Sequence, residues 1–200
     1  HASKIAARTG AKFRAEGSNG RVERGAGRVA IERVPYPVDV ALAATKGTTH
    51  LILVGAKAPV AFFAYPGKPS LLYPPDAEVV TLAAPGEDAE DAMARLADRL
   101  GTSKEQPRLN APRRPDLHRG SLTHEAIAAV VGHHLPENAI VTDESVTTGR
   151  NFFKDTHGAP PHDWLSLTGG AIGEGLPLAP EEPLAGLRRL WRETAFRHEA

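Results

Sequence analysis

The stretch WLSLTGGAIGEGLP, Trp164 to Pro177, joins a short apolar run to a loop that is rich in glycine. Four glycines fall between positions 169 and 175, where the backbone must turn sharply or pass close to another group. A glycine loop that leaves a strand and enters a helix can point several N–H groups at an anion. The spacing leaves two interpretations open: a loop that holds a phosphate-bearing ligand, and a tight strand–helix turn packed on a neighbour.

Composition limits the classes of partner. The chain has 200 residues, 41% of them hydrophobic, and its 24 basic and 24 acidic side chains give a formal net charge of zero. A core can form, and no single-sign field directs the protein to nucleic acid or to an anionic membrane, so we expect neither partner. The absence of cysteine excludes disulfides and thiolate metal sites and agrees with a reducing, cytoplasmic location. The apolar runs are too short to span a membrane.

The strongest strand signal is Leu51–Val54, an uninterrupted apolar run closed by Gly55. Such a run is typical of a central parallel strand that is buried on both faces. A second strand is predicted at Glu78–Leu82 and an amphipathic helix at Glu87–Leu100. This alternation predicts an α/β fold with an open parallel, Rossmann-like sheet.

The first hundred residues contain weaker signals as well. Residues 2–9 and 38–45 have helical spacing, and residues 11–15 suit a short strand. Residues 16–33 contain frequent glycine and several charges, so we expect a solvated loop there.

A polar segment with three prolines, residues 102–120, predicts a stiff linker between two domains, 1–101 and 121–200. In the second domain, Thr123 is a candidate N-cap for a helix, and Ala139–Thr142 and Asp163–Leu167 are predicted strands. Phe152 and Phe153 suggest a short buried helix. Leucines and a tryptophan form a helical stripe near the end of the chain, at Leu184, Leu187, Leu190 and Trp191.

Candidate sites follow two of the strands. Asp143 and Glu144 come at the carboxyl end of a predicted strand, where α/β sheets place ligands. Two carboxylates there could bind Mg²⁺ or act in acid–base chemistry, or they could cap the helix that follows. The segment Gly55–Lys57 could receive a nucleotide phosphate or form a plain loop. The nine histidines lack ligand spacing, so we expect them to be surface or structural residues.

Five stretches together resemble one enzyme family. RVERGAGR (21–28), LILVGAKAPVAFFAYPGKPS (51–70) and EVVTLAAPGEDA (78–89) resemble the middle domain of thiamine-diphosphate enzymes of the acetolactate synthase large-subunit and benzoylformate decarboxylase type. ENAIVTDESVTTGRNFF (137–153) and HDWLSLTGGAIGEGLPLA (162–179) resemble the start of that family's diphosphate-binding domain. The resemblance follows the family's order of segments over most of the chain.

The resemblance implies a decarboxylase or carboligase that acts on 2-keto acids and uses thiamine diphosphate with Mg²⁺. It implies that the cofactor lies against two short segments, which comprise Asp143, Glu144, Ser145, Gly169, Gly170, Ala171, Ile172 and Gly173. It also implies a homo-oligomer, a dimer or a tetramer, and a middle domain that holds FAD or a nucleotide in some relatives.

Two features of the family are missing from these 200 residues. The family activates its cofactor with a Glu from a pyrimidine-binding domain, and it anchors Mg²⁺ through a GDG motif; neither has a counterpart here. We therefore assign no catalytic residue and no metal ligand, and we expect this chain alone to be an incomplete, inactive part of such an enzyme. The alternative is a non-catalytic α/β domain that binds a nucleotide or serves as a subunit scaffold.

Overall fold

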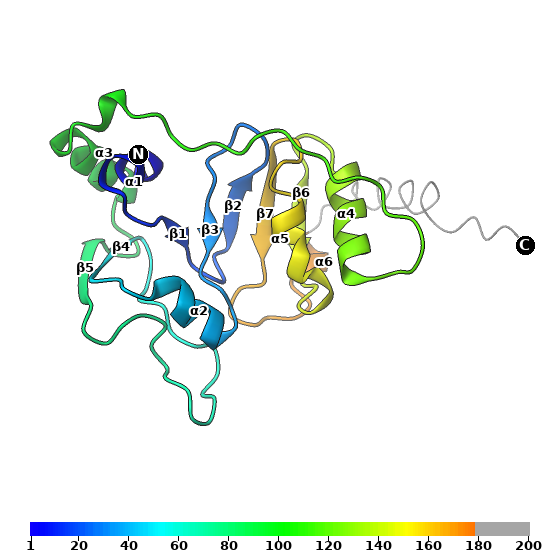
Figure 1. Cartoon of the computed structure of the whole chain (residues 1–200), viewed down its shortest axis with the longest axis horizontal. Helices are drawn as coiled ribbons and strands as arrows, with labels where there is room; N and C mark the ends of the chain where they lie inside the picture. The colour runs from blue at the N-terminus through cyan, green and yellow to red at the C-terminus, as the bar shows by residue number, and fades with distance from the viewer. Residues whose placement is uncertain (179–200) are drawn as a thin grey trace, which may run out of the picture. The chain divides into compact units, whose positions relative to one another are not determined.

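The computed structural model describes residues 1–178 and divides the chain into two compact units (Figure 1). Unit 1 comprises residues 1–17 and 30–108, and unit 2 comprises residues 18–29 together with the described residues from 109 to 178. The short segment 18–29 thus belongs with residues that are far from it in the sequence. The predicted stripe from Leu184 to Trp191 lies outside the described residues.

Unit 1 contains three α-helices, a 3-10 helix and two pairs of parallel strands among its described residues. These elements are α1 (Ala2–Thr9), β1 (Arg14–Ala15), β3 (Glu32–Arg33), α2 (Val38–Thr45), β4 (His50–Val54), β5 (Glu78–Ala83), α3 (Ala89–Arg99) and η1 (Thr102–Lys104). The α/β class predicted from the sequence is confirmed, and α1, α2, α3, β1, β4 and β5 lie within a few residues of their predicted bounds. Strand β3 and the 3-10 helix η1 were not predicted, because they lie in the predicted loop 16–33 and the predicted linker 102–120.

Strand β4 pairs in parallel with β5, with Leu51 opposite Val79 and Ile52 opposite Val80. The prediction that β4 is buried on both faces is wrong: the Ile52 side chain is 55% exposed. Within the described residues, β4 pairs with β5 alone, so the apolar run of β4 lies in a two-stranded sheet with an open face.

Local signals set the helix ends. Helix α1 stops at Gly10, whose φ of 75° is the left-handed conformation that glycine adopts at low cost. The Asp88 carboxylate accepts a hydrogen bond from Asp91 N at 2.9 Å and caps α3. Helix α2 packs Val38 and Ala41 against Leu72 in the small buried core of unit 1.

Unit 2 is built on a three-stranded mixed sheet in the order β2-β7-β6 (Figure 1). The elements of this unit are β2 (Arg21–Arg24), α4 (His124–His134), β6 (Ile140–Asp143), η2 (Thr148–Asn151), α5 (Phe152–Asp155), β7 (His162–Ser166) and α6 (Gly175–Leu178). Strand β2 runs antiparallel to β7, and β6 runs parallel to it. The predicted cap of α4 is confirmed, because Ala126 N donates to Thr123 Oγ1 at 3.2 Å.

The expectation of a solvated loop over residues 16–33 is wrong in part. Strand β2 alternates, with Val22 and Arg24 buried and the two residues between and before them exposed. Glycines on both sides hide this short strand in the sequence, and its partner β7 lies about 140 residues later. Pairing with β7 supplies the hydrogen bonds and buried contacts that the local sequence does not reveal.

Trp164 on β7 is fully buried at the centre of unit 2. The rings of Phe152 and Phe153 lie 6.3 and 6.4 Å from the Trp164 ring, measured between centroids. The guanidinium of Arg24 lies 3.4 Å from the Phe153 centroid, and Arg24 donates to Thr156 Oγ1 at 2.9 Å. The predicted short helix of Phe152 and Phe153 is confirmed as α5, but both side chains are only half-buried.

Within residues 1–178, every helix is too short or too polar to cross a membrane.

Candidate functional site

The candidate site lies where β6 and β7 end. These strands are parallel, and Asp143 is opposite Ser166 in their register, so the segment 143–145 and the loop 167–174 leave the same edge of the sheet. The structure thus brings together the two segments that the sequence predicted as parts of one site.

Asp143 is fully engaged by the protein. One of its oxygens, Oδ1, accepts from Ser145 N at 3.0 Å and from the Ser145 hydroxyl. The other, Oδ2, accepts from the buried Trp164 Nε1 at 3.2 Å. Because both oxygens are occupied, Asp143 fixes the turn after β6 and ties it to the core of unit 2.

Ser145 belongs to the same turn. Its carbonyl accepts from Thr148 N at 3.0 Å, and its hydroxyl packs against Gly149. A Cβ built at Gly149 would lie only 1.6 Å from Ser145 Oγ, so this turn needs glycine at position 149.

Glu144 reaches across to the glycine loop. Its Oε1 accepts from Gly173 N at 3.0 Å and also from Gly175 N. Gly175 is buried, and a Cβ there would lie 3.2 Å from Glu144 Cδ. The carboxylate of Glu144 therefore occupies a position that the loop amides could offer to an external anion.

The loop glycines serve backbone conformation more than close packing. Gly169, Gly170 and Gly173 have φ values of 58°, 72° and 103°, in the left-handed region that favours glycine. A Cβ built at Gly169 or Gly173 would meet no atom of the described chain within 4 Å. Between them, Ala171 and Ile172 are exposed, and the Ile172 side chain is 80% exposed. Close packing on a neighbour is therefore seen at Gly175, against the Glu144 side chain, and not at Gly169 or Gly173 among the described residues.

A second contact within the loop was not predicted. Glu174 Oε1 accepts from Thr168 N, and its Oε2 accepts from Thr168 Oγ1, both at 2.9 Å. These bonds close the loop on itself over six residues. A Thr and a Glu at this separation belong to no recurrent turn motif, so sequence spacing gave no signal for the pair.

The sequence leaves three roles open for Asp143 and Glu144: binding Mg²⁺, acid–base chemistry and capping the helix that follows. Neither caps the helix that follows directly, because the N-cap of η2 is Thr147 and it makes no side-chain cap bond. No group of three or more His, Asp or Glu residues with the geometry of a metal site occurs within residues 1–178.

The other candidate loop, Gly55–Lys57 in unit 1, is also engaged. Gly55 N donates to Ala83 O at 2.8 Å, and Lys57 N donates to Glu16 Oε1 at 2.6 Å. As in unit 2, a glutamate carboxylate takes a loop amide at the carboxyl end of a parallel strand.

His162, which faces Arg24 across the β2–β7 pair, has a structural environment. Its side chain is 3% exposed, and its Nδ1 donates to Pro160 O at 2.7 Å. Burial lowers the pKa of His162; the hydrogen bond to Pro160 O opposes this effect and the charge of Arg24 adds to it. His133 Nδ1 likewise donates to Pro115 O at 2.8 Å.

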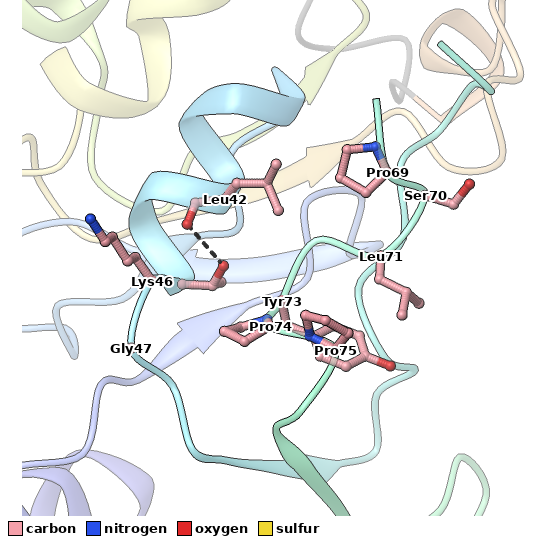
Figure 2. Close-up of a pocket in the computed structure, with 10 residues that line it drawn as sticks. Leu42, Lys46, Gly47, Pro69, Ser70, Leu71, Tyr73, Pro74 and Pro75 are labelled. Atoms are coloured by element: carbon pink, nitrogen blue, oxygen red, sulfur yellow. Dashed lines mark hydrogen bonds between the residues drawn. The ribbon is translucent and has the colours of Figure 1, made fainter. Parts of the chain in front are cut away.

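Unit 1 contains a hollow of about 340 Å³ between the end of α2 and the segment 69–75 (Figure 2). Its walls are mainly apolar, with Leu42 on one side and Pro69, Leu71 and Pro74 on the other, and Figure 2 shows the Lys46 side chain extending away from these prolines. The hollow lies beside the residues that precede β4 and β5. Ligands of parallel α/β sheets bind at the opposite, carboxyl ends and need convergent polar groups, so we do not assign the hollow as the functional site.

Together these observations define an α/β protein with a glycine loop held at the carboxyl end of a parallel strand. No protein-family model matches the chain. The chain is similar to a Mycobacterium tuberculosis protein named "Putative acetolactate synthase large subunit IlvX", with 50% identity over 178 residues. The match covers 89% of this chain and 34% of that relative, so the chain spans about a third of the relative's length.

Proposed function

We propose that this chain is part of a thiamine-diphosphate-dependent 2-keto acid decarboxylase or carboligase of the acetolactate synthase type. The observation that carries the proposal is the 50% identity to the mycobacterial relative over 178 residues. The meeting of Asp143–Ser145 with the loop 167–174 at one sheet edge supports it, because α/β proteins bind ligands at such edges. The division into a middle domain and the start of a diphosphate-binding domain is part of this proposal.

The described residues do not fit a metal-bound diphosphate. Of the eight amides from Thr168 to Gly175, six already donate within the chain, and those of Gly169 and Gly170 have no partner within residues 1–178. The same part of the chain brings no set of metal ligands together. Diphosphate held through Mg²⁺ needs oxygen ligands for the metal and free donors for the phosphates.

We therefore propose that the 200-residue chain alone neither binds thiamine diphosphate with Mg²⁺ tightly nor decarboxylates a 2-keto acid. The absence of a GDG motif from the sequence supports this. Isothermal titration of the chain with thiamine diphosphate, with and without Mg²⁺, is expected to give no saturable heat. Micromolar, Mg²⁺-dependent binding would contradict the proposal, and release of carbon dioxide from pyruvate would contradict it independently.

A second candidate function, subunit scaffolding, is favoured by exposed aromatic residues in unit 1. Tyr36, Phe62, Phe63 and Tyr65 are between 36% and 59% exposed, and their rings follow one another at centroid distances of 6.3, 4.7 and 6.2 Å. Exposed aromatic groups of this kind are enriched at protein interfaces. A homo-oligomer, a dimer or a tetramer, is the assembly we propose.

Sedimentation tests the assembly. The unchanged chain is expected to sediment as a dimer or tetramer, and the double variant Phe62→Ser, Phe63→Ser is expected to shift toward the monomer. Glu137→Ala, an exposed change in unit 2, serves as the control. A clean monomer for the unchanged chain would contradict the proposal of assembly.

A further inference from the structure

Glu144 holds the second half of the glycine loop through a single oxygen. Oε1 accepts from Gly173 N at 3.0 Å and from Gly175 N, while its neighbour Asp143 is anchored to the Trp164 indole. The Glu144 side chain is half-buried. The backbone at Glu144 is therefore fixed by the core of unit 2, independently of the contacts that its side chain makes with the loop.

A carboxylate that accepts two backbone N–H groups resembles a phosphate oxygen in charge and geometry. A ligand anion that used the same two amides would have to displace it. Within residues 1–178, the loop amides without a partner are those of Gly169 and Gly170, on the other side of the exposed Ala171–Ile172 segment. Glu144 thus takes two amides at one end of the loop and leaves the amides of Gly169 and Gly170 available.

The contact between Glu144 and the loop requires a residue without a side chain at position 175. A Cβ at this position would lie between 3.2 and 3.3 Å from three atoms of the Glu144 side chain. Gly175 has an ordinary φ, so its lack of a side chain here serves the approach of Glu144 rather than a left-handed turn. The glycine and the glutamate act as a pair, although 31 positions separate them.

We propose that Glu144 is a positioning residue that holds the glycine loop as an internal anion, so that a diphosphate-type ligand gains the Gly173 and Gly175 amides only when this carboxylate leaves. The ligand class rests on the proposed function, whereas the hold on the loop rests on the contacts alone. The carboxylate keeps the loop in shape without a ligand and competes with any anion for the same two donors.

Amide hydrogen exchange, resolved by NMR, tests the hold on the loop. In Glu144→Ala, exchange of the Gly173 and Gly175 amides is expected to accelerate by about tenfold or more, because a charge-assisted hydrogen bond is lost. Glu144→Gln keeps an oxygen acceptor and is expected to show a smaller acceleration. Glu137→Ala, an exposed change in the same unit, is the matched control and should leave both rates unchanged.

Inorganic pyrophosphate, added without metal, tests the competition. We expect it to shift the Gly173 and Gly175 amide resonances in Glu144→Ala at concentrations that leave them unmoved in the unchanged chain and in Glu137→Ala. A purely structural role of Glu144 would not produce this difference. If Glu144→Ala loses the dispersed signals of β7, Glu144→Gln replaces it in both measurements.

Equal exchange rates in the unchanged chain and the variants would overturn the hold on the loop. An equal response to pyrophosphate, or none in either variant, would overturn the competition. Neither measurement uses thiamine diphosphate or Mg²⁺, so its failure is distinguishable from failure of the proposed function, which depends on cofactor titration.

Discussion

Both units place a glutamate on the amides of a loop that leaves a parallel strand, but they support that glutamate very differently. In unit 1, the exposed Glu16 accepts from one amide, that of the exposed Lys57. In unit 2, the half-buried Glu144 accepts from two amides and follows a residue anchored to a fully buried tryptophan. The strength with which a glutamate holds such a loop thus depends on how rigidly its backbone is fixed, because a pre-organised acceptor loses less entropy on contact.

The sheets of the two units also differ in how fully their apolar side chains are buried. Unit 2 encloses Trp164 within a three-stranded sheet and its covering residues, whereas β4 and β5 of unit 1 leave Ile52, Val79 and Val80 at least 40% exposed. A packed core thus supports the strand ends of unit 2, whereas the strand ends of unit 1 belong to a two-stranded sheet whose apolar side chains are partly exposed.

Trp164→Ala is expected to have the largest effect. Removal of a fully buried Trp costs about 3–5 kcal/mol of unfolding free energy. It also removes the donor to Asp143, so the Gly173 amide should exchange faster while the Lys57 amide keeps its rate. Leu122→Ala, a change at a 71% exposed site in unit 2, is the control. Urea unfolding with residue-resolved exchange checks both effects, and an unchanged Gly173 rate would break the link between core and loop.

Gly25→Ala tests whether unit 2 depends on the close approach at the end of β2. A Cβ at Gly25 would lie 2.5 Å from Pro160 O, and its φ is 105°. We expect a loss of about 3 kcal/mol, from strain in the left-handed region and from overpacking. Gly27→Ala is the matched control: its φ is 75° and an added Cβ would meet no atom of residues 1–178 within 4 Å, so a loss of only about 1 kcal/mol is expected. Equal midpoints in thermal unfolding for the two variants would contradict the close approach.

A smaller effect on the stability of unit 2, with a defined direction in pH, is expected from His162. The pKa of His162 in the folded state is lowered from its ordinary value of 6.5, chiefly by burial. Below pH 6.5 the unfolded chain therefore binds a proton at this residue that the folded chain does not. The free energy of unfolding should decrease as the pH is lowered from 6.5 to the pKa of the folded state. Above pH 6.5 this residue should contribute no pH dependence.

His162→Asn is the control for that test, because its side-chain amide can still donate to Pro160 O. Urea midpoints measured between pH 5 and 8 should show a weaker decline on acidification in the variant than in the unchanged chain. Parallel declines would indicate that other groups cause the acid sensitivity.

Sequence predictions that depend on local signals are confirmed, and those that depend on partners remote in the chain are wrong. Leu51–Val54 and the Thr123 cap are local signals, and the structure confirms the strand and the cap. The burial of that strand and the existence of β2 depend on partners remote in the chain, and both predictions were wrong. The contact of Glu144 with Gly173 spans 29 positions, and no spacing rule connects them. The sequence thus located the two segments of the candidate site but not the bonds between them.

Glu16→Ala is expected to have the smallest effect, and it tests whether the two glutamates hold their loops with different strength. An exposed glutamate with one acceptor bond should protect the Lys57 amide only slightly, so its loss should speed exchange there by about twofold to tenfold. Glu144→Ala should accelerate two amides, each by more than this. Glu90→Ala, an exposed change in the same unit, controls for the loss of charge. If Glu16→Ala matched the effect of Glu144→Ala, the rigidity of the strand end would not determine the hold on the loop, and the local hydrogen bond alone would account for both.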